Sequence, residues 1–322
     1  MILDVEKPLL ELEEKIEELK KVNETGKIDI AKEIKAMEKK ARELKKEIYK
    51  NLNPWDRVLM ARHPQRLTTL DYIEAVFDDF LELHGDRFYS DDPAMVAGLA
   101  SLKGSTYMVM GHQKGKETKE NLRRNFGMVN PDGFRKAGRL MKLAEKFGFP
   151  VITFIDTPGA YPGIEAEERG QYDAISKNIA LMMGLKVPIL VVIIGEGGSG
   201  GALAIAAGDR VIILENAIYS VISPEGCASI IWRDATKAPE AAHALGITGE
   251  FLLERELVDE ILPEPLGGVH KDRETTYNIV RDAIIRIMDE LTKLKPDQLT
   301  QKRYDKYRRM GAFEKVKPEK SK

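Results

Sequence analysis

Apolar side chains in the first fifty residues recur at helical spacing between charged positions. Such narrow seams are typical of paired helices. Residues 1–52 are therefore predicted to form an antiparallel helical hairpin, broken near Gly26, that packs on the body of the protein or on a partner subunit. The seam positions step by three or four residues in two series: Leu9, Leu12, Ile16 and Leu19, then Ile34, Met37, Ala41, Leu44 and Ile48.

The middle of the chain changes to continuous apolar runs separated by helical patterns. Two strands around Gly104 are predicted within residues 94–115, and an amphipathic helix is predicted from Pro131 to near Gly148. Strands that alternate with helices favour a parallel sheet with right-handed crossovers, so the predicted fold class is α/β with mostly parallel strands. The other strand-length apolar runs lie at residues 151–155, 187–194, 210–216 and 217–223.

Patterns outside these runs are weaker. The prolines and mixed polarity of residues 53–66 indicate a linker, and the apolar spacing of residues 69–83 and 271–294 predicts helices. The last residues are rich in lysine and arginine, and we expect them to be frayed. The predicted organisation is a hairpin arm at 1–52, one α/β domain at 53–300, and a basic, flexible tail at 301–322.

Composition limits the class of protein without identifying it. The formal net charge is −2 with 32% charged residues, so no general attraction to nucleic acid or to an anionic membrane is expected. A single cysteine, Cys227, argues against an internal disulfide and a cysteine-based zinc site, and we expect no metal in this chain. No signal peptide and no apolar run of about 20 residues is evident, so we expect a cytoplasmic protein.

The densest group of glycines directly follows an apolar run, in "IIGEGGSGGALAIAAGDR" at residues 193–210. A P-loop would need a lysine that is absent, and the following helix is too short for a normal dinucleotide-binding unit. Close packing of a helix on the sheet accounts for the small residues after Gly201. It does not account for the bare loop before that helix.

A second Pro/Gly loop, "DTPGAYPG" at residues 156–163, also follows an apolar run, one crossover earlier. Because the carboxyl ends of parallel strands share one edge of a sheet, we expect the two loops to lie together. Backbone N–H groups there can stabilise an oxygen that gains negative charge, and one such donor contributes roughly 3 kcal/mol. The loops therefore favour enolate or ureido-anion chemistry over phosphate binding.

Side chains suited to nucleophilic or acid–base chemistry are scarce near these loops. We interpret "GGSGG" around Ser199 as differing from the G-x-S-x-G pattern of a serine nucleophile elbow, and no His–Asp pair is evident nearby. Glu196 and Glu225 are candidate acid–base residues, although each could instead cap a helix. The predicted site is built mainly from backbone groups. The scattered histidines that we interpret as ordinary surface or core residues are His84, His112 and His243.

Three segments carry a resemblance to a known family: residues 111–171, which include "FIDTPGAYPGIEAEERGQ", then "IGEGGSGGALAI" and "YSVISPEGCASIIW". They resemble the carboxyltransferase α subunits of bacterial-type acetyl-CoA carboxylase, and the likeness covers nearly the whole chain. The segment "ITGEFLLERELVDEIL" is similar to the closing segment of the wider crotonase superfamily. The resemblance implies a crotonase-like ββα superhelix preceded by an N-terminal α-helical hairpin.

The resemblance also implies a reaction. The family transfers a carboxyl group from N1-carboxybiotin, carried by the biotin carboxyl carrier protein, to acetyl-CoA, and so forms malonyl-CoA for fatty acid synthesis. A β subunit of the same fold, which bears a zinc element, supplies most of the acetyl-CoA half of the site in an α2β2 assembly. Biotin carboxylase acts in the wider complex. The implied base is the biotin ureido anion, so biotin belongs to the carrier and not to this chain.

Carried onto this sequence, the resemblance assigns site residues to the two loops and to the basic stretch before them. Gly200 and Gly201 hold the ureido oxygen, while Gly159 and Ala160 supply further N–H donors. A solvated loop is the alternative interpretation of the basic stretch. The residues expected to contact the substrate or the carrier are Gly197, Gly198, Tyr161, Lys114, Lys116, Arg123 and Arg124.

Two other functions compete with this one. An enoyl-CoA hydratase or isomerase shares the superfamily, and Glu225 follows a strand as a hydratase glutamate does, but no second glutamate is evident at the expected position. A scaffold or an RNA-binding module suits the basic tail and leaves the two loops unexplained. Activity without a β subunit or a biotin carrier would favour the hydratase, and salt-sensitive nucleic-acid affinity would favour the binder.

Overall fold

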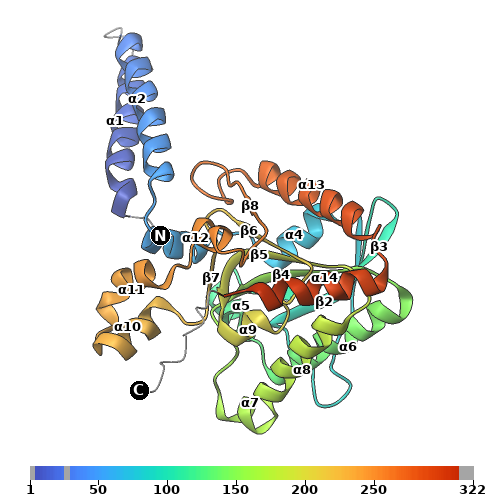
Figure 1. The fold of residues 1–322 in the computed structure, drawn as a ribbon. Coiled ribbons are helices and arrows are strands. Elements are labelled where there is room, and N and C mark those ends of the chain that lie inside the picture. Colours follow the sequence, from blue (N-terminus) through green and yellow to red (C-terminus); the bar gives the residue numbers. More distant parts are fainter. Residues whose placement is uncertain (1–3, 25–29, 312–322) are drawn as a thin grey trace, which may run out of the picture.

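The computed structural model describes residues 4–24 and 30–311, and an eight-stranded sheet lies at its centre (Figure 1). Its strands are β1 (Asp79–Glu82), β2 (Met95–Leu102), β3 (Ser105–His112), β4 (Val151–Thr157), β5 (Ile189–Gly198), β6 (Arg210–Leu214), β7 (Ile218–Ser220) and β8 (Glu260–Leu262). They run in the order β1-β2-β3-β4-β5-β6-β8, and β7 pairs with the carboxyl end of β5. β1, β2 and β3 are antiparallel neighbours, and every pairing from β3 onward is parallel. The predicted α/β fold with mostly parallel strands is confirmed.

The parallel strands are apolar because both faces of the sheet are covered. β4 is buried along its whole length, as is β5 up to Gly197, and both are rich in valine and isoleucine. α6 packs on β2 and β3 with α8 beside it, while α4 and α13 lie together over the other face. The helices of the body are α3 (Pro54–Ala61), α4 (Thr69–Val76), α5 (Thr118–Arg123), α6 (Pro131–Phe147), α7 (Ile164–Glu168), α8 (Gln171–Gly184), α9 (Ser199–Leu203), α10 (Pro224–Trp232), α11 (Ala238–Leu245), α12 (Gly249–Glu254), α13 (Arg273–Leu291) and α14 (Pro296–Arg309).

Two further helices, α1 (Lys7–Glu24) and α2 (Ala31–Lys50), lie side by side and stand away from the body (Figure 1). The predicted seam residues pack against one another between them, and the hairpin is confirmed within the described residues. The predicted break at Gly26 lies outside those residues. Among the helices of residues 4–24 and 30–311, none combines the length and the apolar character needed to cross a membrane. The seam residues that are buried are Leu9, Ile16, Ile34 and Ala41.

The linker predicted at residues 53–66 is wrong for its first part, because Pro54–Ala61 form helix α3. Asn53 caps this helix: its side chain accepts the N–H of Asp56, and the Asp56 carboxylate accepts the N–H of Asn53. Pro54 occupies the first helical position, where a missing N–H has no cost. α3 and the residues after it carry Arg62 and Arg66 toward the carboxyl end of β5.

The helix predicted at residues 69–83 ends early. α4 stops at Val76, and Asp79–Glu82 form the edge strand β1, paired antiparallel with β2. Gly98 permits this pairing, because a Cβ there would lie 2.1 Å from the backbone oxygen of Leu81. The apolar spacing of the segment suits a helix, but pairing with the edge of the sheet determines the structure.

The frayed tail predicted from residue 301 is wrong for residues 301–309, which continue helix α14. The guanidinium of Arg303 is buried and forms an ion pair with Asp209 at 2.7 Å. It also donates hydrogen bonds to the carbonyl oxygens of Met182, Leu185 and Val187. These contacts fasten α14 to the end of α8 and to the segment that leads into β5.

Candidate functional site

The two predicted loops leave the sheet at the same edge. β4 and β5 are parallel neighbours whose register shifts after Ile155, so that Thr157 pairs with Gly197. The first loop follows Thr157, and the second begins within β5 and enters α9 at Ser199. The expectation that both loops lie at one edge of the sheet is confirmed.

The loops touch through their backbones, which explains why this part of the sequence lacks side chains. A Cβ on Gly198 would lie 2.1 Å from the carbonyl oxygen of Pro158, and one on Gly201 would lie 2.4 Å from the amide nitrogen of Ala160. Gly200 is different, since its Cβ would meet only Ile175 at 3.8 Å. Gly198 and Gly201 therefore set the contact between the loops, and Gly200 lies where there is space.

The N–H groups of the loops are not equally available. The N–H of Gly159 donates to Oγ1 of Thr157 at 3.1 Å, so this residue is already committed within its own loop. Within the described residues, the N–H of Ala160 has no hydrogen-bond acceptor. Gly200 and Gly201 belong to the first turn of α9, where N–H groups have no partner inside the helix. Of the predicted second pair, Ala160 is the better candidate donor.

Gly200 borders an apolar cavity of about 350 Å³. Its lining comes from α9, β7, α12 and the end of α14. The C-terminal helix thus contributes to the surroundings of the glycine loop, which sequence reasoning missed. The side chains that line this cavity include Leu203, Tyr219, Leu252, Leu257, Tyr307 and Met310.

The interpretation of "GGSGG" needs correction, because Gly197, Ser199 and Gly201 do match the G-x-S-x-G spacing. Ser199 has φ +51° at a turn from strand to helix, as the serine of a nucleophile elbow does. Its hydroxyl has no hydrogen bond within the described residues, and the buried His112 bonds instead to the carbonyl oxygen of Gly201 at 3.1 Å. Burial lowers the pKa of His112 to about 4. The turn has the elbow geometry without the base that a serine nucleophile requires.

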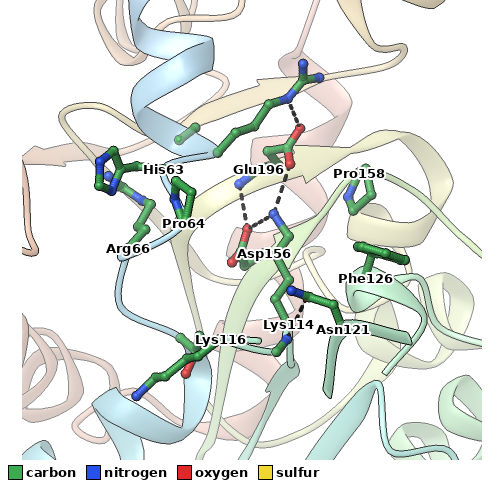
Figure 2. A pocket seen from close by; sticks show the side chains of 14 residues that line it. His63, Pro64, Arg66, Lys114, Lys116, Asn121, Phe126, Asp156, Pro158 and Glu196 are labelled. Carbon is green, nitrogen blue, oxygen red and sulfur yellow. Dashed lines mark hydrogen bonds and ion pairs between the residues drawn. The ribbon is translucent and has the colours of Figure 1, made fainter. Parts of the chain in front are cut away.

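A second cavity, of about 360 Å³, is bordered by Pro158 of the first loop and is lined by many charged side chains (Figure 2). Lys114 follows β3, and its Nζ lies 2.7 Å from Oδ1 of Asp156 and 2.9 Å from Oε1 of Glu196. Arg62 binds the other oxygen of Glu196 at 2.7 Å and also binds Glu225 at 2.5 Å. Sequence reasoning missed Arg62 and Asp156, although "DTPG" begins with this aspartate and the residues after Asn53 carry helix-capping signals.

The two candidate acid–base glutamates are held as ion-paired carboxylates. Burial alone would raise the pKa of Glu196, but the charges of Lys114 and Arg62 outweigh it and lower this pKa to about 2. Burial likewise acts to raise the pKa of Glu225, and its bonds to Arg62 lower it on balance. Both side chains are therefore ionised near neutral pH, and neither is prepared to donate a proton.

The other predicted contact residues fall into separate places. Lys116 pairs with Asp71 at the rim of the charged cavity. Arg124 bonds to Glu120 and to the carbonyl oxygen of Pro93, which holds its own loop. Arg123 is exposed, and no hydrogen bond or ion pair joins it to any of the described residues.

Tyr161 and the three histidines interpreted from the sequence lie in ordinary packing or surface environments. The ring of Tyr161 lies over Gly163, where a Cβ would be only 2.5 Å from it. His84 and His243 are exposed and His112 is buried, in agreement with their interpretation as ordinary surface or core residues. No cluster of three or more histidine, cysteine or acidic side chains suited to a metal ion occurs within residues 4–24 and 30–311.

Comparisons with known proteins agree with this architecture. A carboxyltransferase α subunit of acetyl-CoA carboxylase from Thermus thermophilus is 55% identical over 313 residues, covering 97% of this chain and 99% of the relative. A transcarboxylase 12S structure aligns with a TM-score of 0.58 at 19% identity, over 80% of this chain and 44% of that chain. A malonate decarboxylase heterotetramer from Pseudomonas aligns with a TM-score of 0.59 at 15% identity, over 74% and 92%.

The fold is that of a crotonase-like carboxyltransferase, with paired glycine loops at the carboxyl ends of neighbouring parallel strands. Residues 2–311 match the family described as acetyl co-enzyme A carboxylase carboxyltransferase-like. The chain belongs to the family of acetyl-CoA carboxylase carboxyltransferase α subunits. The fold class, the transferase class and the family expected from the sequence are all confirmed, and the hydratase alternative is not favoured.

Proposed function

We propose that this chain forms the carboxybiotin half of a carboxyltransferase site and that a β subunit completes it. In this proposal the assembly is α2β2. It transfers a carboxyl group from carboxybiotin, presented by a biotin carboxyl carrier protein that biotin carboxylase charges, to acetyl-CoA. The observation that carries the proposal is the backbone contact between two glycine loops, next to an apolar cavity.

The surroundings of Gly200 fit the biotin ring system. Biotin carries a small, largely apolar bicyclic ring with one ureido group, and the cavity beside Gly200 is about 350 Å³ with mostly apolar walls. When bound, carboxybiotin supplies the carboxyl group and a ureido oxygen that becomes negative as that group leaves. Leu203, Tyr219 and Tyr307 would hold the ring. Gly197 and Gly198 do not line this cavity: Gly197 lies against the ring of Tyr219, and Gly198 lies against the carbonyl oxygen of Pro158.

The chain's own contribution to the chemistry is a set of N–H donors. Gly200 and Gly201 would direct their N–H groups toward the negative oxygen, with Ala160 as a third donor from the facing loop. Backbone donors that are fixed before the reaction need no reorganisation, and each contributes about 3 kcal/mol to transition-state stabilisation. The backbone of Gly201 lies directly against that of Gly159 and Ala160. This contact fixes the distance between the N–H groups of Gly200 and Gly201 and that of Ala160.

Side-chain acid–base catalysis by this chain has little support. Glu196 and Glu225 are bound in ion pairs, and within the described residues no hydrogen bond joins the Ser199 hydroxyl to an imidazole, since His112 bonds to the carbonyl oxygen of Gly201. A hydratase needs a carboxyl group that can exchange protons with its substrate. These features favour the carboxyltransferase over an enoyl-CoA hydratase or isomerase.

The exposed Arg123 is the best candidate of the basic stretch for a contact with the carrier or with a CoA phosphate. Lys116 lies at the rim of the charged cavity. It would contact the carrier or a CoA phosphate only by releasing Asp71. Lys114 and Arg124 are engaged within the chain, so a substrate role for them has less support.

The proposal is tested by malonyl-CoA-dependent carboxylation of biocytin, measured for this chain alone and for the chain co-purified with a β subunit. We expect carboxybiocytin only from the pair, and none when malonyl-CoA is omitted. A well-folded pair without this activity would contradict the proposal. Hydration of crotonyl-CoA by the chain alone would favour the hydratase instead.

A further inference from the structure

A buried ion-pair network lies directly beneath the two glycine loops. Lys114 is at its centre, with its Nζ between Oδ1 of Asp156 and Oε1 of Glu196 (Figure 2). The side chains of these three residues are 19%, 5% and 8% exposed, respectively. The two carboxylates come from adjacent parallel strands, β4 and β5.

Stability is a weak explanation for such a network. Removing charged groups from water costs free energy that their attraction barely recovers, and well-packed apolar side chains often serve as well. What an ion-pair network can do better is to fix the relative position of the elements that it joins. Its value then depends on what those elements carry.

Each carboxylate is located at the start of one loop. Asp156 precedes Thr157, and Glu196 precedes Gly197. Oδ1 of Asp156 accepts the N–H of Glu196 at 3.0 Å and is also paired with Lys114, so a single oxygen atom links both strands to the lysine. The Lys114 ammonium therefore joins β4 to β5 through these two carboxylates, at the residues that immediately precede the two loops.

The side chains of Asp156 and Lys114 fit here only because two neighbouring residues are glycines. A Cβ on Gly195 would lie 2.3 Å from Oδ1 of Asp156, and one on Gly127 would lie 3.0 Å from Cγ of Lys114. Gly127 has φ +79° and follows Phe126 and Asn125, which also have positive φ. Such a left-handed turn of three residues is strained, so the chain holds an unfavourable conformation where the Lys114 stem passes.

We propose that Lys114 is a positioning residue, whose ammonium fixes the separation of the two glycine loops through Asp156 and Glu196 and thereby places the N–H donors of Gly200 and Gly201. This inference rests on the proposed function of those donors. It assigns Lys114 a role inside the chain in place of contact with the substrate or carrier.

The protonation state of Lys114 suits this role. Burial alone would lower the pKa of Lys114, but the carboxylates of Asp156 and Glu196 outweigh burial and raise the pKa above its ordinary value. The lysine is therefore charged throughout the working range of pH. Arg62 binds Glu196 from the other side and leaves Lys114 as the bridge to Asp156.

The test uses the chain co-purified with a β subunit and compares wild type with Lys114→Met, Lys114→Arg and the control Lys177→Met. Lys177 pairs with Asp173 on the exposed face of α8, so its variant removes an equal charge that is not paired with Asp156 or Glu196. For Lys114→Met we expect kcat for biocytin to fall on the order of 100-fold with little change in KM, because misplacement of catalytic groups by about 1 Å has such an effect. Lys114→Arg should recover most of kcat, and Lys177→Met should behave as wild type.

Hydrogen exchange supplies a readout that does not depend on activity. In Lys114→Met the amides of residues 157–163 and 197–203 should exchange faster, while those of α13 stay unchanged. If Lys114→Met does not fold, Glu196→Gln replaces it, with the same expected pattern and a smaller loss of kcat. Unchanged exchange, or a fall in melting temperature with normal kcat, would overturn the inference. An inactive wild-type pair with the expected exchange pattern would refute the proposed function alone.

Discussion

Replacement of Gly201 by alanine is the most direct perturbation of the contact between the two loops. The new Cβ would lie 2.4 Å from both the amide nitrogen of Ala160 and the carbonyl carbon of Gly159. Ordinary van der Waals contact begins about 1 Å farther out. Because the obstructing atoms are backbone, no side-chain rotation relieves the clash, and the loops must separate by about that amount.

The expected consequence follows from the size of this displacement. Misplacing a catalytic group by about 1 Å reduces the rate about 100-fold, and loss of a single oxyanion donor costs 100- to 1,000-fold. Gly201→Ala should therefore lower kcat for biocytin carboxylation by at least roughly 100-fold in the pair with a β subunit. Melting curves should show some loss of stability as well, so kcat is measured well below the melting temperature.

Gly184→Ala is the matched control. Gly184 is the last residue of α8, and a Cβ there would have no atom within 4 Å. This variant should keep wild-type kcat and melt at the same temperature or slightly higher, since alanine favours a helix by about 0.5–1 kcal/mol over glycine. A Gly201→Ala enzyme with near-normal kcat would show that the loops can separate without effect on the reaction, and would contradict a role for their contact in placing the N–H donors.

The remaining predictions concern stability and can be measured by urea denaturation. Ser199→Gly should raise the free energy of unfolding by about 1 kcal/mol, because Ser199 has positive φ; Lys103→Gly, at φ +50°, should do the same. Arg303→Met should lower that free energy by roughly 3–5 kcal/mol by leaving a buried carboxylate without its partner, while Arg308→Met on the exposed face of α14 should change it by less than about 0.5 kcal/mol. The folded-state pKa of Glu196 is about 2, below its usual 4.5, so its stabilising contribution is complete above pH 4.5 and is lost as the pH falls toward 2. Glu196→Gln should therefore flatten the loss of stability over that range, and equal slopes for the two proteins would contradict the assignment.

The parts of the fold that could be predicted are those in which one periodicity runs through a whole element. The seam of the hairpin, the buried run from Val151 and the amphipathic helix from Pro131 are continuous patterns, and each element forms where it was expected. The two glycine loops could also be placed together, because the edge of a parallel sheet collects the carboxyl ends of its strands.

The predicted linker and the predicted tail were wrong because the polar or basic composition of each segment outweighed the helix signals that it also carries. The sequence from Asn53 carries a capping box with proline at the first helical position, but its mixed polarity favoured a linker. In α14, Leu299, Arg303 and Tyr307 follow one another at intervals of four residues on the face that packs on the body. The many basic side chains on its other face led to the prediction of a flexible tail.

The charged network was beyond sequence reasoning for a different reason. Arg62, Lys114, Asp156 and Glu196 are far apart in the chain, and only the order of the strands brings them together. Lys114 looked like one cation of a basic, solvated stretch. Its burial against two carboxylates follows from the position of β3 beside β4, which no local pattern encodes.

In the proposed function, backbone N–H groups of this chain hold the ureido oxygen of biotin. Hydrogen exchange of the chain paired with a β subunit, measured with and without saturating biocytin, tests it most directly. If these groups hold the oxygen, biocytin should slow the exchange of the amides of residues 197–203 and leave those of α1 and α2 unchanged. Unchanged exchange at 197–203 in a pair that carboxylates biocytin would contradict it, because the oxygen would then be held elsewhere.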